Sequence, residues 1–295
     1  MRTLSLTRRF QLGTLIPLLC GVSLGTLALQ NDSVARKPEQ SWTGQRIVTL
    51  KGFGDYFAIG EHGQPQLVKP EALGVNIVAV VQRIGGDRIW IKANGQGDAP
   101  VGWVSIGDAI LLDDAIPYFT ALLKSNPDDW DSYLRRAESE HALNQREAAI
   151  SDYTAAIKLH PDEPFLYVRR GRQFRIVKAC DKAAADFDKA THLKPEWPEP
   201  YNLEAGVYAD CPDPQYRNPA KAISLMEEAI ARDIQHPVYL TVLALAYARN
   251  GEPEKAVSAQ KRALASPRFP PAYREEATNQ LHEYEREVAG KKQAH

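Results

Sequence analysis

A sequence pattern that recurs with a period of 34 runs through the chain, and it limits the possible folds more than any other feature. NPDDWDSYLRRA begins at Asn126, and HPDEPFLYVRRG begins one period later, at His160. Both stretches place a proline second, a tyrosine eighth and an arginine pair after it. The same spacing relates several sets of aromatic and small residues: Tyr133, Tyr167 and Tyr201; Ala137, Gly171 and Ala205; Phe119, Tyr153 and Phe187; Ala149 and Ala183.

These residue types indicate pairs of antiparallel helices. An aromatic residue and a small residue four positions later lie on one helical face, where the small residue lets a second helix approach closely. Each unit ends on a proline, which lacks a backbone donor and stops the second helix. One pair cannot bury its apolar face alone, so the pairs must stack on one another.

The period therefore predicts an all-α array over residues 112–267. A lone helix is expected at 113–126, followed by pairs at 129–161, 163–195, 197–234 and 237–266. Five extra residues enter in the turn CPDPQYRNP, because the period places the counterpart of Ala183 at position 217, whereas the chain carries it at Ala222. Residues 268–291 carry apolar residues on one stripe, which predicts a capping helix.

Spacing, residue type and terminal proline together resemble the tetratricopeptide repeat (TPR) family, over about Asp113 to Pro267. The resemblance implies a right-handed solenoid whose first helices line a concave face that holds a peptide or protein partner. Successive inner positions then include five candidate partner-binding residues: Arg135, Arg169, Arg172, Arg175 and Asn202. Three of the arginines share one face of one helix, and forked hydrogen bonds from them suit a carboxylate or an acidic segment.

A structural explanation of the same charges stands beside this one. Glu138, Asp152 and Asp186 can neutralise nearby arginines, and exposed charges on helices are usually solvated. The second arginine of each pair, Arg136 or Arg170, is expected at the edge of its helix pair with its stem packed.

Residues 44–111 have a different character and predict a small all-β domain. RIVTL, NIVAVVQRI and DRIWIKA are rich in β-branched and aromatic residues, and Gly85-Gly86 suits a hairpin turn. Five short strands are expected. GWV, at 102–104, and the preceding RIWIK resemble a bacterial SH3-like barrel, which implies a ligand groove marked by Trp90 and Trp103. The alternative is that these tryptophans belong to the core.

Residues 1–29 predict an export segment. Arg2, Arg8 and Arg9 precede an uncharged run over residues 12–29, which suits either a signal peptide, cleaved after Ala28, or a membrane anchor. Both place the rest of the chain outside the cytoplasm, in the periplasm or secreted. Residues 30–43 are polar and predict a linker. Cys180 and Cys211 both fall near turns, and the sequence leaves open whether they pair.

No motif indicates catalysis. The sequence has no phosphate-binding glycine loop, no H-E-x-x-H and no zinc-type grouping of cysteine and histidine, so we predict no cofactor and no metal. The formal net charge of −1 disfavours a nucleic-acid partner. The predicted function is a non-enzymatic adaptor or scaffold. The alternative is a cell-envelope targeting protein whose SH3-like domain binds wall polymer or peptide, with the repeats as a spacer or oligomeriser.

Overall fold

The computed structural model describes residues 42–50, 56–59, 65–68, 78–93, 101–232 and 236–293. The predicted export segment at 1–29 lies outside these residues, as does most of the predicted linker at 30–43. Among the helices described, none combines the length and the apolar character needed to cross a bilayer.

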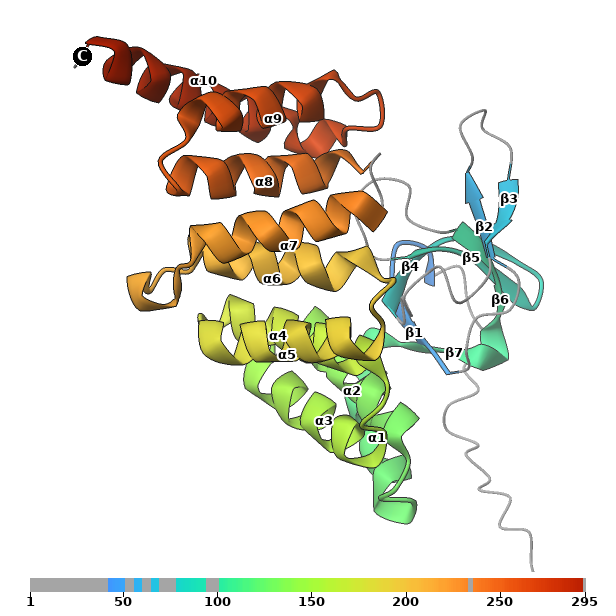
Figure 1. The fold of residues 1–295 in the computed structure, drawn as a ribbon. Helices are drawn as coiled ribbons and strands as arrows, with labels where there is room; N and C mark the ends of the chain where they lie inside the picture. The colour runs from blue at the N-terminus through green and yellow to red at the C-terminus, as the bar shows by residue number, and fades with distance from the viewer. Residues whose placement is uncertain are drawn as a thin grey trace, which may run out of the picture. The chain divides into compact units, whose positions relative to one another are not determined.

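The β part is a single antiparallel sheet (Figure 1). Its strands are β1 (Arg46–Thr49), β2 (Tyr56–Ile59), β3 (Pro65–Val68), β4 (Val78–Gly85), β5 (Arg88–Ala93), β6 (Val101–Ser105) and β7 (Ala109–Leu111). They lie in the order β3-β2-β6-β5-β4-β1-β7. The all-β character is confirmed, although the described strands number seven against the five expected. The SH3-like resemblance stays a prediction.

The predicted hairpin joins β4 to β5. Its two turn residues are Gly86 and Asp87, one position later than the glycine pair suggests, and Gly86 has a φ of +64°, where glycine carries no steric cost. One face of these strands packs into a small core around Ile47, Ile89 and Ile91.

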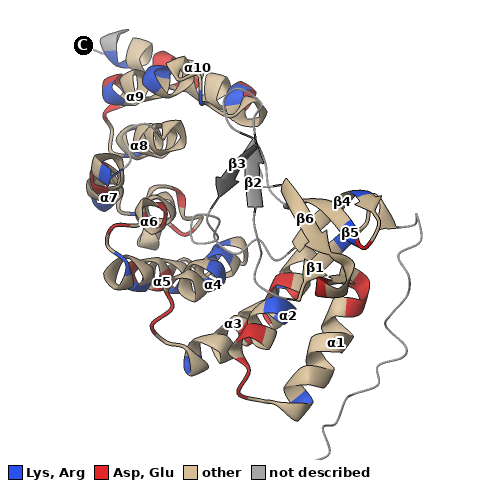
Figure 2. Cartoon of the chain, turned by 90° about the vertical axis from the view of Figure 1, so that its right-hand side faces the viewer, with Lys and Arg blue, Asp and Glu red and all other residues tan. Residues whose placement is uncertain are grey.

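Ten α-helices follow among the described residues, and they confirm the helical array (Figure 1). They are α1 (Leu112–Ser125), α2 (Trp130–Ala142), α3 (Arg146–Leu159), α4 (Pro164–Ile176), α5 (Cys180–Leu193), α6 (Pro198–Asp210), α7 (Pro219–Arg232), α8 (Pro237–Arg249), α9 (Pro253–Ala265) and α10 (Pro271–Gln293). Hairpins form between α2 and α3, α4 and α5, α6 and α7, and α8 and α9. In Figure 2 the first helices of these hairpins form an inner row, and the second helices form an outer row.

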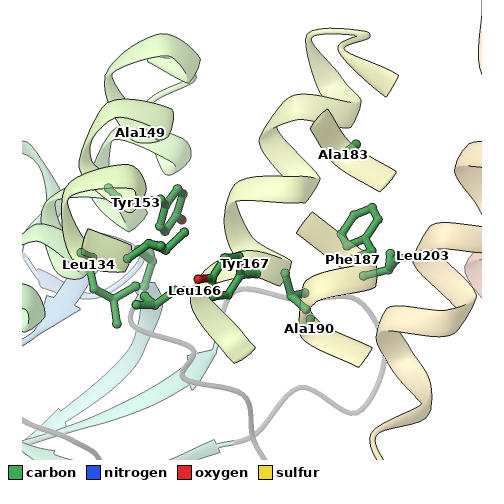
Figure 3. Close-up of a cluster of buried hydrophobic side chains, with 14 of the residues drawn as sticks. Leu134, Ala149, Tyr153, Leu166, Tyr167, Ala183, Phe187, Ala190 and Leu203 are labelled. Atoms are coloured by element: carbon green, nitrogen blue, oxygen red, sulfur yellow. The ribbon is translucent and has the colours of Figure 1, made fainter. Parts of the chain in front are cut away.

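Close packing of aromatic against small residues holds each hairpin together. Tyr153 and Phe187 are completely buried, at equivalent positions of the two outer helices α3 and α5 (Figure 3). Gly171 on α4 faces Phe187 so closely that an added Cβ would lie 2.7 Å from the ring. The small residues of the period therefore leave space for aromatic rings to pack against them, as the spacing predicts.

The sheet and the first hairpin share one hydrophobic core. β7 ends at Leu111 and α1 begins at the next residue, so no linker separates them. Val48 and Ile110 from the sheet belong to the same buried cluster as Leu134 on α2. The shared cluster fixes the sheet against the start of the helical array.

A disulfide joins Cys180, the first residue of α5, to Cys211, directly after α6. The two Cα atoms lie 6.3 Å apart, and both residues are buried. The bond closes a loop across two neighbouring hairpins, at the enlarged turn that holds the short 3-10 helix η4 (Pro214–Tyr216).

Candidate functional site: the inner row of helices

The second arginine of the first pair is a structural clamp. Arg136, on α2, donates from Nε and from one amino group to the Asp152 carboxylate of α3, at 2.5 and 2.8 Å. Its other amino group donates to the Thr120 hydroxyl of α1 at 3.0 Å. The hydrogen bond to Asp152 raises the pKa of Arg136, which stays charged. One guanidinium thus ties three helices together.

The next hairpin repeats this clamp. Arg170 donates to Asp186 of α5 at 2.9 and 2.7 Å, and to the Thr154 hydroxyl of α3 at 3.1 Å. Burial raises the pKa of Asp186, while the hydrogen bond and charge of Arg170 lower it. Both arginines lie at helix-pair edges, as the sequence predicts, and both are neutralised within the array.

Arg135 is not on an open surface, although the period places it among the inner positions. It is only 4% exposed and donates to the backbone carbonyl of Thr49, at the end of β1. Its Nε also donates to Asp131 at 2.6 Å. Arg46 of β1 adds a hydrogen bond to the Ala142 carbonyl, at 3.0 Å. We therefore correct the expectation for Arg135, because β1 covers this part of α2 and occupies its guanidinium.

Arg169, on α4, is half-buried and has an acidic neighbour. Its Nε lies 3.3 Å from Oε1 of Glu138, and its guanidinium lies over the Phe165 ring. The same Glu138 oxygen accepts a hydrogen bond from Tyr153 at 2.7 Å. Burial raises the pKa of Tyr153 well above its usual value, so the phenol is a neutral donor. Because Glu138 offsets part of its charge, Arg169 attracts an acidic partner less strongly than an unpaired arginine would.

Arg172 lies one turn further along α4 and forms an ion pair with Glu199 of α6. Both side chains are more than a third exposed, so the pair is accessible and contributes little to stability. The Nε atom of Arg172 is buried and has no hydrogen-bond partner among the described residues.

Arg175 is the last arginine of α4, and within the described part of the chain it has neither an ion pair nor a hydrogen bond. Its guanidinium lies over Gly206 of α6, where an added Cβ would be 3.6 Å from the nitrogen. Partial desolvation and the charge of Arg172 lower the pKa of Arg175. An anion beside Arg175 would relieve both effects.

Asn202 faces the same region from α6. The residue is half-buried, and its Oδ1 atom has no hydrogen-bond donor among the described residues. An unpaired buried acceptor costs free energy until a donor reaches it. Arg172, Arg175 and Asn202 form what we call the α4–α6 surface, and its available group is the exposed, unpaired guanidinium of Arg175. A carboxylate is the chemical complement of that guanidinium.

The tryptophans lie on a different surface. Trp90 on β5 faces Trp103 on β6, with ring centroids 5.4 Å apart in an edge-on arrangement. Arg83, which the sequence analysis did not single out, lies 5.4 and 5.2 Å from the two ring centroids. Trp103 is 36% exposed and Trp90 is half-buried, so neither belongs to the fully buried core. A β-bulge between Val81 and Arg83 places Arg83 on the same face as Trp90, whereas strict alternation from Val81 would have predicted the opposite face.

Comparison with known proteins agrees with the helical geometry. The tetratricopeptide repeat family model matches residues 111–164 and 217–273. The helical array is a TPR solenoid. A TPR protein from Parabacteroides merdae has the same fold, with 16% identity over 62% of this chain and 69% of its own, and a TM-score of 0.53.

Two further solved structures are similar. MamA from Desulfovibrio magneticus aligns over 54% of this chain and 88% of its own, with 17% identity and a TM-score of 0.49. A thermophilic TPR protein from Thermus thermophilus aligns over 58% and 90%, with 18% identity and a TM-score of 0.46. No curated protein matches the sequence. TPR arrays are protein-interaction modules, and the repeats of this chain support an adaptor role.

Proposed function

We propose that this chain is a non-enzymatic adaptor of the cell envelope that holds an acidic segment of a partner protein on the α4–α6 surface. The observation that carries the proposal is the unpaired guanidinium of Arg175, which lies over Gly206 of α6, one helical turn from Asn202. A carboxylate of the segment would accept forked hydrogen bonds from this exposed guanidinium. The ligand is held by a surface that the stacked helices preform, which limits the ordering cost of binding.

The location outside the cytoplasm is part of the proposal. It is supported by the basic, then apolar, N-terminal sequence and by the Cys180–Cys211 disulfide, since disulfides persist in oxidising compartments.

Charge reversal tests the site. The double variant Arg172→Glu, Arg175→Glu places two negative charges on the surface, and Lys189→Glu, an exposed position on the outer helix α5, is the matched control. Partners are captured from a cell-envelope extract with each protein, identified, and then titrated by calorimetry. We expect the double variant to lose the partner that the wild type and the control retain, and wild-type binding to weaken as salt rises. Equal affinity for all three proteins would disprove the site.

A second candidate function is attachment to the cell wall through the sheet. The exposed Trp103 ring with Arg83 beside it favours this candidate, because exposed aromatic rings are common in peptide and polymer grooves. Trp103→Ala would then abolish co-sedimentation with isolated walls, whereas the α4–α6 double variant would leave it unchanged. Sedimentation that survives Trp103→Ala would reject the second candidate.

A further inference from the structure

A cavity of about 300 Å³ opens beside the enlarged turn, away from the α4–α6 surface. Its floor is apolar and consists of Cys180 and Ala184 from α5 and Val207 from α6, all buried. Two aromatic residues form its walls: Tyr208 of α6, and Tyr216 of η4, which is 38% exposed. The volume is at the low end for ligand pockets and suits a single large side chain.

The cavity exists because this hairpin departs from the period in two ways. Ala184 occupies the position that Ile150 occupies one period earlier, on α3. The alanine side chain has three carbon atoms fewer than isoleucine, which leaves space above the floor of the cavity. Tyr216 comes from the enlargement of the turn and adds a wall that the period does not supply to the other hairpins. Figure 1 shows this turn projecting from the array between α6 and α7.

The rim of the cavity is acidic. Asp181 and Asp188 lie seven positions apart on α5, which places them on one helix face about 10 Å from each other. Asp181 has no ion pair or hydrogen bond among the described residues, and the Asp188 carboxylate has only an exposed contact there, 3.5 Å, with His192. A ligand therefore meets uncompensated negative charge from these two carboxylates.

Lys221, the basic residue of the rim, is already neutralised. Its Nζ lies 3.0 Å from Oε1 of Glu204, which is almost completely buried, and 3.0 Å from the Tyr208 hydroxyl. The contacts raise the pKa of Lys221 to about 12, so its charge remains paired with Glu204 at neutral pH.

The preceding hairpins show which side chain contacts the position equivalent to Asp188. In the first two clamps an arginine donates to Thr120 or Thr154 of the preceding outer helix. In the third hairpin the equivalent positions are Asp188, in place of the threonine, and Glu204, in place of the arginine. The third hairpin therefore has no arginine at this position. The residue that would accept the hydrogen bond of such an arginine is a carboxylate, Asp188.

From these observations we propose that the cavity is a second binding site, which takes an arginine side chain from a partner protein. The apolar floor would hold the methylene stem, the tyrosine rings would stack on the guanidinium, and Asp188 would accept its hydrogen bonds. The site is separate from the α4–α6 surface and has the opposite charge preference, so either site can be correct without the other.

The test uses the full chain and acetyl-arginine methylamide as the probe. Acetyl-citrulline methylamide has the same shape without the charge and serves as the matched control. Binding is followed by the shifts of amide resonances of α5, α6 and the enlarged turn during titration. We expect the arginine probe to bind at least threefold more tightly than the citrulline probe, in the millimolar range typical of so small a ligand.

Three variants locate the site. Ala184→Ile restores the residue of the preceding hairpin and should abolish the shifts, and Asp188→Asn should remove the preference for arginine. Asp162→Asn, in an exposed turn elsewhere, should change nothing. Circular dichroism checks that each variant is folded. If Ala184→Ile does not fold, Asp188→Asn by itself tests the proposal. Equal binding of the two probes, shifts on other helices, or an arginine preference that survives Asp188→Asn would overturn the proposal.

Discussion

Replacing Glu140 with glutamine should stabilise the protein at alkaline pH but not at acidic pH. Glu140 lies on α2, is only 7% exposed, and its Oε2 atom has no hydrogen-bond partner among the described residues. Burial first, and the charge of Asp152 second, raise its pKa from 4.5 to about 7. Arg136 opposes this only in part, because its forked hydrogen bonds go to Asp152.

The sign of the effect follows from the raised pKa. Below pH 4.5 the carboxyl is protonated in both the folded and the unfolded chain, so it costs nothing. Between pH 4.5 and 7 the unfolded chain ionises first, and the free energy of unfolding falls as pH rises. The full loss, reached above pH 7, is at most about 3 kcal/mol for such a difference in pKa. Glutamine cannot ionise, so the variant escapes this loss.

Urea unfolding followed by circular dichroism, at pH 5 and at pH 8, measures the effect. We expect Glu140→Gln to unfold with a free energy about 1–3 kcal/mol higher than wild type at pH 8, and within about 1 kcal/mol of wild type at pH 5. Glu196→Gln, at an exposed position, is the control and should behave like wild type at both pH values. The same difference between Glu140→Gln and wild type at both pH values would refute the reasoning.

Three further stability predictions concern the disulfide, a residue with positive φ and two helical glycines. Replacing both Cys180 and Cys211 with serine should cost about 3–4 kcal/mol, because the disulfide spans 31 residues of sequence, and urea unfolding of wild type with reductant should match the variant. Lys178→Gly should add about 1 kcal/mol of stability, because Lys178 has a φ of +63° in the turn after α4. Gly251, with a φ of +79°, occupies the equivalent place in the turn after α8. A lower melting temperature of Lys178→Gly would contradict this prediction. Gly171→Ala should cost about 1–3 kcal/mol of stability, because the added Cβ would clash with Phe187. Gly206→Ala should add about 0.5–1 kcal/mol, because no atom lies closer than 3.6 Å to the added Cβ. Thermal unfolding that shifts both variants in the same direction would reject the packing argument.

The helical array is predictable from sequence because its energetics are local and repeated. Each aromatic residue meets a small residue within its own hairpin or the next one, so the period carries the fold. The period also shows where the pattern breaks, at the added residues of the turn after α6.

The properties of individual side chains depend on contacts between distant segments, which the period does not encode. Arg135 and Arg169 are equivalent positions of the period, yet their contacts differ. Arg135 donates a hydrogen bond to the backbone of β1, whereas Arg169 lies beside Glu138. The pairing of Cys180 with Cys211 depends on how closely two hairpins approach. The cavity beside the enlarged turn depends on Ala184, Tyr216 and Asp188, which a search for repeated residues passes over because all three depart from the pattern.

Hydrogen–deuterium exchange on the full chain with its captured partner bound tests whether the α4–α6 surface is the binding site. Amide protection reports which helices the partner covers. We expect added protection on α4 and α6, which the Arg172→Glu, Arg175→Glu variant should lose, and unchanged exchange in the sheet. Protection confined to the sheet around Trp103, with α4 and α6 exchanging as in the free protein, would contradict this expectation.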